Sequence, residues 1–94
     1  MLGRSGIDFL EGGLGNDTLH AGLSNDLIFG DEGNDYIGWN PGDDKIHGGT
    51  GNDSVEGGSG NDRILGEDGM DTLEGNSGDD RIWGGDGHLS LIHI

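Results

Sequence analysis

The sequence predicts an all-β solenoid in which short parallel strands stack into two sheets. Two observations support this fold class: a nine-residue period runs through the chain, and one position of every unit is aliphatic. Repetition at a fixed period is typical of repeat architectures. The units begin at Gly3 and read, without a change of frame, GRSGIDFLE, GGLGNDTLH, AGLSNDLIF, GDEGNDYIG, WNPGDDKIH, GGTGNDSVE, GGSGNDRIL, GEDGMDTLE, GNSGDDRIW and GGDGHLSLI.

The last three residues of each unit are predicted to form a short strand with one side chain facing inward. A strand of this length is not stable alone, but stacking many of them buries a continuous aliphatic ladder. Two units make one flattened coil of 18 residues, so the chain forms about five coils with equivalent residues about 4.8 Å apart. The predicted core is the eighth position: Leu10, Leu19, Ile28, Ile37, Ile46, Val55, Ile64, Leu73, Ile82 and Leu91.

The first six positions of each unit are predicted to form turns, because they are rich in Gly, Asn and Asp. The fourth position is Gly in nine of the ten units, with Ser24 as the exception, and the sixth is Asp in nine of the ten. Stacking places these carboxylates in two rows, one along each edge. The rows are Asp8, Asp26, Asp44, Asp62 and Asp80 on one edge, and Asp17, Asp35, Asp53 and Asp71 on the other.

The composition indicates a cation as the natural partner. The chain has 94 residues, of which 23 are Gly, 19 are acidic and only 4 are Lys or Arg, so its formal net charge is −15. Low hydrophobicity and high net charge are typical of chains that stay disordered on their own. So few basic residues exclude a nucleic-acid-binding surface, and no apolar run is long enough for a membrane span. The absence of Cys excludes disulfides and thiolate metal sites.

The spacing of the carboxylates favours calcium. Carboxylates about 4.8 Å apart repel each other by roughly 1 kcal/mol in water. A hard cation midway between two coils would lie about 2.4 Å from oxygens on both sides, which is the Ca²⁺–O distance. Ligand sets made of oxygen alone favour Ca²⁺ over Zn²⁺ or Cu²⁺. Four Asp pairs on one edge and three on the other predict about seven Ca²⁺, whose charge of +14 nearly cancels −15.

These units resemble the nonapeptide repeats of the RTX family, with the pattern G-G-x-G-x-D-x-U-x. The unit from Gly12 to His20 fits throughout, as do the units that start at Gly48 and Gly57. The resemblance implies a right-handed parallel β-roll over residues 3–88, with Ca²⁺ bound by the Asp carboxylates and by backbone carbonyls of the first four positions. The glycines that it implies as carbonyl donors are Gly13, Gly15, Gly33, Gly49, Gly51, Gly58, Gly60, Gly69 and Gly78.

The resemblance also implies where such a module works. RTX proteins are typically exported from bacteria by type I secretion machinery, remain unfolded at low cytosolic Ca²⁺, and fold outside the cell. We therefore expect a secreted calcium-binding module without catalytic residues. Two kinds of parent protein stay open: a secreted enzyme, such as a metalloprotease or lipase, or a large adhesin. An upstream H-E-x-x-H or G-x-S-x-G motif would indicate the enzyme, and further repeats the adhesin.

Several units depart from the pattern. Ala21 and Trp39 replace the first Gly, and the turn Trp39-Asn40-Pro41 is expected to form the weakest sites. Other residues replace the second Gly: Arg4, Asp31, Asn40, Glu67 and Asn76.

The last six residues, 89–94, are mostly apolar and uncharged, unlike the acidic, glycine-rich repeats that precede them. They can be back-translated to CTGTCTCTTATACACATC, a transposon mosaic end used in sequencing libraries. We interpret them as a non-native tail read through from that adapter, which makes the chain a fragment of a longer protein. The alternative is a natural capping segment.

One outer face of the solenoid is predicted to be basic and apolar. Lys45, Arg63 and Arg81 share the seventh position on a single sheet. The ninth position beside them carries Phe29, His47, Leu65 and Trp83. This face is a candidate for packing against a neighbouring domain or a second roll. The alternative is that exposed strand positions vary freely. His20, His47, His88 and His93 could suggest a transition-metal site, but we expect them to be solvent-facing strand residues.

Overall fold

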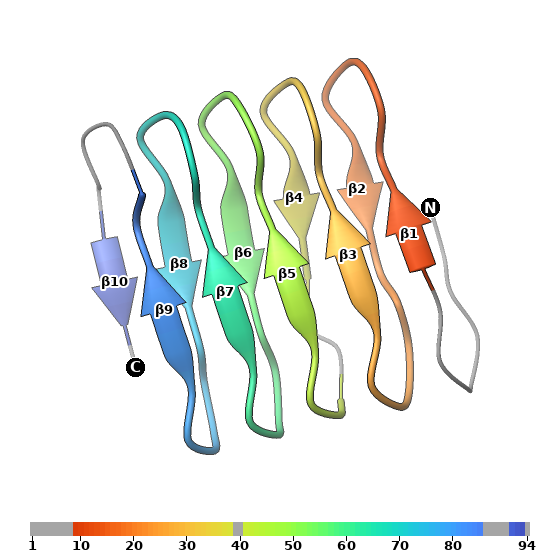
Figure 1. The fold of residues 1–94 in the computed structure, drawn as a ribbon, viewed down its shortest axis with the longest axis vertical. Coiled ribbons are helices and arrows are strands. Elements are labelled where there is room, and N and C mark those ends of the chain that lie inside the picture. Colours follow the sequence, from red (N-terminus) through yellow and green to blue (C-terminus); the bar gives the residue numbers. More distant parts are fainter. Residues whose placement is uncertain (1–8, 39–40, 86–90, 94) are drawn as a thin grey trace.

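The computed structural model describes residues 9–38 and 41–85, together with the backbone of residues 91–93. The strands alternate between two five-stranded sheets (Figure 1). One sheet contains β1 (Phe9–Glu11), β3 (Leu27–Phe29), β5 (Lys45–His47), β7 (Arg63–Leu65) and β9 (Arg81–Trp83). The other contains β2 (Thr18–Leu19), β4 (Tyr36–Ile37), β6 (Ser54–Glu56), β8 (Thr72–Glu74) and β10 (Leu91–His93).

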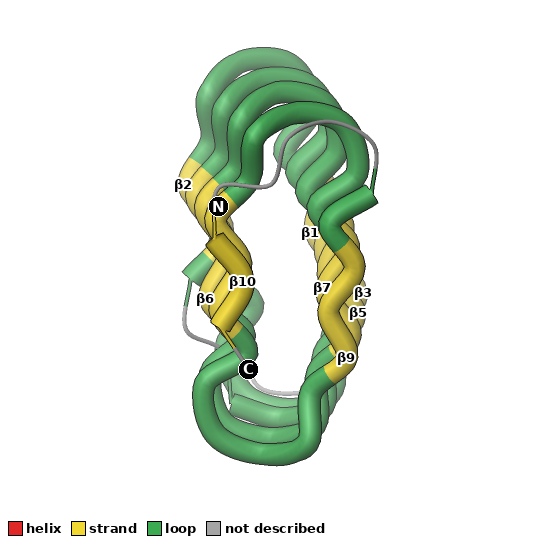
Figure 2. Tube along the Cα trace, turned by 90° about the vertical axis from the view of Figure 1, so that its left-hand side faces the viewer, coloured by secondary structure: helices red, strands yellow, loops and turns green. Residues whose placement is uncertain are grey.

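Every strand pairs in parallel with the strand one coil away. In the first sheet, for example, Ile28 is the Cα partner of Ile46, and Ile46 is the partner of Ile64, so the register offset is 18 residues. Seen along the stack, the two sheets face each other and the turns close both ends of a flattened ring (Figure 2). The described residues contain no helix and therefore no helical membrane span. The predicted all-β parallel solenoid is confirmed.

The core lies between the sheets and is one layer of aliphatic side chains. The eighth-position residues from Leu19 to Leu73 are 0% exposed, Leu10 is 6% exposed, and Ile82 packs against the cluster from the end of the stack. The molecule measures 33 × 28 × 13 Å, so its thin direction has room for this single layer. The predicted inward position is therefore confirmed from Leu10 to Ile82, and each of these units contributes one large apolar side chain to the core.

The last strand departs from the predicted frame. Ile92, not Leu91, is the Cα partner of Leu73, and Leu91 is paired with Thr72. The offset between β8 and β10 is thus 19 residues, where every other pair has 18. The nine-residue frame holds as far as Gly84, whose carbonyl oxygen faces Gly66 one coil earlier. In backbone register, Ile92 and not Leu91 therefore aligns with the eighth-position residues, and the predicted alignment of Leu91 is wrong.

The turns contain left-handed backbone at the second and fourth positions of each unit. The fourth residue has φ between 85° at Ser24 and 115° at Gly42. The second residue is also left-handed where it is not Gly: φ is 68° at Asp31, 66° at Glu67 and 67° at Asn76. Asn and Asp tolerate this conformation best among residues with a Cβ. The replacements at Arg4 and Asn40, like Trp39, lie outside the described residues.

We expect the core ladder to contribute strongly to the free energy of unfolding. Ile46→Ala removes a fully buried side chain from the middle of the stack and should lower the free energy of unfolding by about 2–5 kcal/mol. Leu14→Ala removes a similar volume from a turn residue that is 79% exposed and should have almost no effect. Urea unfolding of both variants in excess Ca²⁺ tests this. Equal losses would mean that the layer between the sheets is not the core.

Candidate metal centre

The sixth-position aspartates form the two predicted rows. Asp17, Asp35, Asp53 and Asp71 lie in the turns that lead into β2, β4, β6 and β8, and Asp26, Asp44, Asp62 and Asp80 in the turns that lead into β3, β5, β7 and β9. These two sets of turns form opposite edges of the stack (Figure 1). Six of these side chains, from Asp26 to Asp71, are at most 3% exposed. The structure thus brings together eight of the nine predicted aspartates. The ninth, Asp8, lies outside the described residues.

One carboxylate oxygen of six aspartates, from Asp35 to Asp80, is held by the preceding coil. The backbone N–H of Asp35 donates to Oδ1 of Asp53, and the N–H of Asp53 donates to Oδ1 of Asp71, both at 2.8 Å. The same bond joins Asp17 to Asp35, Asp26 to Asp44, Asp44 to Asp62 and Asp62 to Asp80, at 2.8–2.9 Å. These charge-assisted bonds fix the orientation of each carboxylate and leave its second oxygen pointing to one place.

That second oxygen, Oδ2, is buried without a hydrogen-bond donor. This holds for Oδ2 of Asp17, Asp35, Asp44, Asp53, Asp62, Asp71 and Asp80. Buried polar atoms in proteins are normally paired, and an unpaired buried charge is costly. The same exception in coil after coil indicates a shared missing partner, and the partner of a bare carboxylate oxygen is a cation.

The first-position glycines open a small space beside these oxygens. A Cβ added to Gly30 would lie 2.5 Å from the carbonyl oxygen of Gly48 and 2.8 Å from Oδ2 of Asp35. At Gly48 the corresponding distances are 3.0 Å to the Gly66 carbonyl and 2.8 Å to Asp53 Oδ2. Gly12, Gly57 and Gly66 have the same surroundings. Their φ angles are not left-handed, so space, and not backbone conformation, requires Gly here.

The glycines that the resemblance implied as carbonyl donors occupy the second and fourth positions. Gly13, Gly49 and Gly58 are second-position residues, and all have φ between 80° and 92°. The fourth-position carbonyls face the next coil: a Cβ added at Gly33 would clash with the Gly15 oxygen, and one added at Gly51 with the Gly33 oxygen. The remaining fourth-position residues of this set are Gly60, Gly69 and Gly78. Each turn therefore offers carbonyl oxygens as well as a carboxylate to the layer between coils.

Burial raises the pKa of the interior carboxylates. Desolvation is the main cause and raises the pKa of Asp44, Asp53 and Asp62 to about 7. The hydrogen bond from the preceding coil lowers each pKa, and the negative charge of neighbouring aspartates raises it again. The pKa values of Asp35 and Asp71 are also raised, with desolvation again the largest cause. Without a cation, the rows therefore resist ionisation at neutral pH.

A second polar ladder at the fifth position was not predicted from the sequence. The backbone N–H of Asn34 donates to Oδ1 of Asn16 at 2.7 Å, and that of Asn52 donates to Oδ1 of Asn34 at 2.8 Å. On the other edge the ladder joins Asn25, Asp43, Asn61 and Asp79. These side chains accept from the following coil, whereas the aspartates accept from the preceding one. The signal was present, because Asn or Asp fills this position in seven of the ten units.

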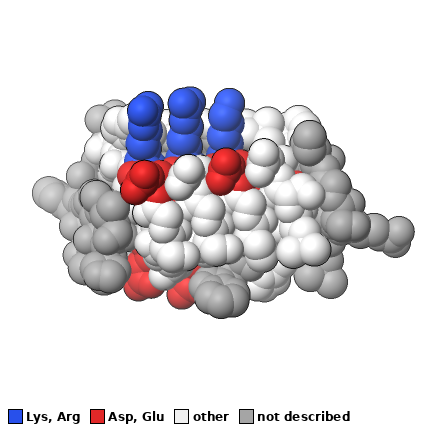
Figure 3. Space-filling view, turned by 90° about the horizontal axis from the view of Figure 1, so that it is seen from below, with Lys and Arg blue, Asp and Glu red and all other residues white. Residues whose placement is uncertain are grey.

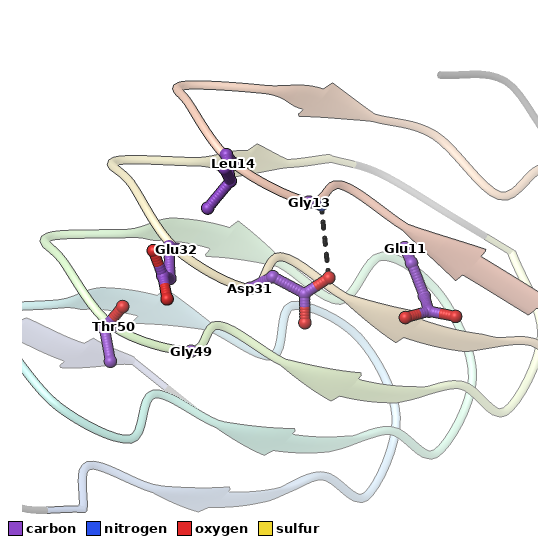
Figure 4. Close-up of a pocket in the computed structure, with 7 residues that line it drawn as sticks. All are labelled: Glu11, Gly13, Leu14, Asp31, Glu32, Gly49 and Thr50. Carbon is purple, nitrogen blue, oxygen red and sulfur yellow. Dashed lines mark hydrogen bonds between the residues drawn. The ribbon is translucent and has the colours of Figure 1, made fainter.

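One second-position side chain accepts a backbone N–H from another coil. The carboxylate of Asp31 points toward Gly13 and accepts its backbone N–H at 3.1 Å (Figure 4). Asp31 thus replaces the usual Gly, keeps its left-handed φ, and adds a contact to the preceding coil. This replacement is compatible with the turn.

The donor set fits calcium. Among the described residues, no three side chains of His, Cys, Asp or Glu gather at one point. A site between two coils must therefore combine aspartate oxygens with backbone carbonyls. Ca²⁺ accepts such all-oxygen sets in flexible geometry, whereas Zn²⁺ and Cu²⁺ prefer nitrogen or sulfur ligands.

Comparison with known proteins agrees with this chemistry. No curated protein and no solved structure gives a significant match to the chain. A family model of the RTX calcium-binding nonapeptide repeat, which spans four copies, matches residues 2–37, 40–69 and 65–88. The matched segments cover most of the chain, and they include both rows of aspartates. The chain therefore belongs to the RTX calcium-binding nonapeptide repeat family.

Proposed function

We propose that this chain is a module of a secreted bacterial protein that folds when it binds Ca²⁺. The single observation that best supports this is the buried Oδ2 atom without a donor, repeated along both edges. The net charge of −15 supports it as well, because a chain with so many carboxylates and so thin a core is poorly stabilised on its own.

The aspartates have three tasks in this mechanism. Oδ1 of each sixth-position aspartate from Asp35 to Asp80 accepts the N–H of the preceding coil and so holds the carboxylate in place. Oδ2 faces the space beside the first-position glycine, where it and the carbonyl oxygens would hold Ca²⁺. Each interior aspartate would serve the sites on both sides of its coil. About seven bound ions would offset most of the −15 charge, so binding energy becomes folding energy.

We further propose that the module works outside the cell. Extracellular calcium modules bind at about 10⁻⁴–10⁻³ M, well above cytosolic Ca²⁺, so the chain would remain unfolded during export by type I secretion machinery. The parent protein is a secreted enzyme, such as a metalloprotease or lipase, or a large adhesin in which the roll is a spacer. The residues upstream of the repeats decide between them.

A calcium titration tests the proposed folding. Far-UV circular dichroism of the 94-residue chain should change from coil to β with a midpoint of about 0.1–1 mM Ca²⁺. Mg²⁺ should not replace Ca²⁺, because it requires a smaller octahedral site. A chain fused after His88 to a capping domain is the control for fraying of the last coil. If neither form responds to Ca²⁺, the repeats do not couple folding to calcium.

Acid should have opposite effects with and without calcium. In EDTA, the folded-state pKa of about 7 at Asp44, Asp53 and Asp62 exceeds the ordinary value of 3.8, so the folded state binds more protons. Its stability should rise as pH falls from about 7 toward 4. With Ca²⁺, protons compete for the same oxygens, so the calcium midpoint should rise over the same range. Circular dichroism between pH 8 and pH 5 in both media measures this. If acid destabilises the folded state in EDTA as well as in Ca²⁺, this expectation is contradicted.

We also propose that the outer face of the β1–β9 sheet packs against a neighbouring domain or a second roll. Lys45, Arg63 and Arg81 are Cα partners in adjacent strands and form a row of positive charge (Figure 3). Like charges in register are destabilising, and none of the three forms an ion pair within the described residues. Beside the row, Leu65 and Trp83 line a shallow groove, and Trp83 is 49% exposed.

Substitutions on this face should separate packing from calcium binding. Phe29→Ser with Trp83→Ser should leave the calcium midpoint unchanged, because neither residue lies in a turn, and should reduce association in sedimentation velocity experiments. Thr18→Ser with Thr72→Ser on the opposite sheet is the matched control. If association of the Phe29 and Trp83 variant equals that of the control, the apolar face is incidental.

A further inference from the structure

The outer face of the β2–β10 sheet carries a short row of negative charge. Glu56 in β6 and Glu74 in β8 are Cα partners at the ninth position of their units. Like charges in register destabilise a sheet, and neither glutamate forms an ion pair within the described residues. The hydroxyl of Tyr36 donates to Oε2 of Glu56 at 3.2 Å, but this neutral donor leaves the charge in place. We refer to the two glutamates as the acidic row.

The basic row on the β1–β9 sheet, formed by Lys45, Arg63 and Arg81, is in the same situation. Its three side chains are exposed and come from adjacent strands. Asp43 and Asp79 border the same surface from the neighbouring turns, yet no ion pair joins them to the row in the part of the chain that the structure describes. The roll therefore presents a row of each sign, one on each broad face.

The two rows border the same edge of the molecule. Strands of the two sheets run in opposite directions (Figure 1), so residues that enter the first sheet and residues that leave the second lie near the same turns. The seventh position of the first sheet and the ninth position of the second both adjoin the turns that lead into β3, β5, β7 and β9. Figure 3 looks onto this edge and shows the three cations standing out from one face.

The rows also alternate along the stack. The chain winds continuously, so β6 lies between β5 and β7, and β8 between β7 and β9 (Figure 1). Glu56 is therefore placed between the levels of Lys45 and Arg63, and Glu74 between those of Arg63 and Arg81. Both rows have the same spacing of about 4.8 Å, because both follow the distance between paired strands. A second copy displaced along the thin direction of the molecule would set two glutamates over the gaps between three cations.

We propose that copies of this roll stack face to face, with the basic row of one copy on the acidic row of the next. The inference rests on the proposed packing role of the β1–β9 face and identifies its partner as a second copy of this chain. The contact is heterologous, because the two copies use different faces. Each added copy therefore presents a free face to the next one.

The rest of the two faces is compatible with this arrangement. The same displacement sets Tyr36, which is 37% exposed, opposite Phe29 and His47, whose stacked rings have centroids 4.6 Å apart. It sets the small side chain of Thr72 opposite the groove that Trp83 lines, which leaves room for the half-exposed indole. The broad face measures 33 × 28 Å, enough for the roughly 800 Å² that each partner buries in a standard interface.

Bound calcium is a condition for this stacking. A net charge of −15 on each chain opposes the association of two copies, and calcium ions along the edges would remove most of that repulsion. Association should therefore appear only in Ca²⁺. It should weaken at high salt, because salt screens the attraction between the rows.

Neutralising one face at a time tests the contact. The basic-face variant carries Arg63→Gln with Arg81→Gln, and the acidic-face variant carries Glu56→Gln with Glu74→Gln, which keeps an acceptor for Tyr36. In sedimentation velocity with excess Ca²⁺, each variant alone should self-associate about tenfold more weakly than the unsubstituted chain. An equimolar mixture should form a complex of two chains, because one variant retains its acidic row and the other its basic row. Growth should stop there, because both outer faces of that complex are neutralised.

A matched control separates the rows from net charge. Glu32→Gln with Asp68→Asn removes as many negative charges as the acidic-face variant, but from exposed residues in the turns that lead into β4 and β8. This control should associate like the unsubstituted chain. The calcium midpoint in circular dichroism should be the same for the two face variants and the unsubstituted chain, which shows that each variant folds.

The outcomes separate this inference from the proposed functions. If the chain shows no calcium-dependent transition, calcium-dependent folding is wrong and the stacking with it. If the chain folds with Ca²⁺ but stays monomeric at about 1 mM, where even weak interfaces associate, the stacking is overturned and calcium-dependent folding stands. If Phe29→Ser with Trp83→Ser reduces association but the mixture forms no complex of two chains, the packing face stands and the acidic row is not its partner.

Discussion

The buried carboxylate at the sixth position of the interior units, from Asp35 to Asp71, is the group on which the rest of the structure depends. Its Oδ1 atom joins two coils through the backbone, and its Oδ2 atom is buried without a donor. The aliphatic layer supplies only one large side chain per nine residues, which is little apolar burial for so much ordered backbone. Cohesion between coils therefore depends on the edges as much as on the core, and the edges carry the charge.

Most of the fold could be predicted from the sequence because every unit meets the same physical requirement. One inward aliphatic, one turn carboxylate and a fixed length of nine residues determine which residues stack, and the structure pairs Ile28 with Ile46 and Ile46 with Ile64 accordingly. The period also located the aspartate rows along the two edges. In this chain, the nine-residue period alone predicts which residues lie close together in the stack.

The direction of the hydrogen bonds between coils and the space around the turn glycines could not be predicted from the nine-residue period. The period brings Asn16 near Asn34, but which of them donates depends on how the turn orients its peptide planes. The first-position glycines resemble the other turn glycines in sequence, yet they are required for space and not for a left-handed φ. The shift at β10 occurs in the unit that has Leu89 where the other units have the aspartate.

The constant offset between bonded residues has a consequence for how such a chain changes length. The carboxylate and amide ladders join residues 18 apart wherever they occur in the stack. Duplicating or deleting 18 residues would lengthen or shorten the rod while leaving every remaining contact with an equivalent partner. A change of nine residues would instead exchange the two sheets beyond that point and move the basic row to the opposite face. Genes for such rods can therefore expand by whole coils, and the spacing between a protein's other domains can vary without redesign of the fold.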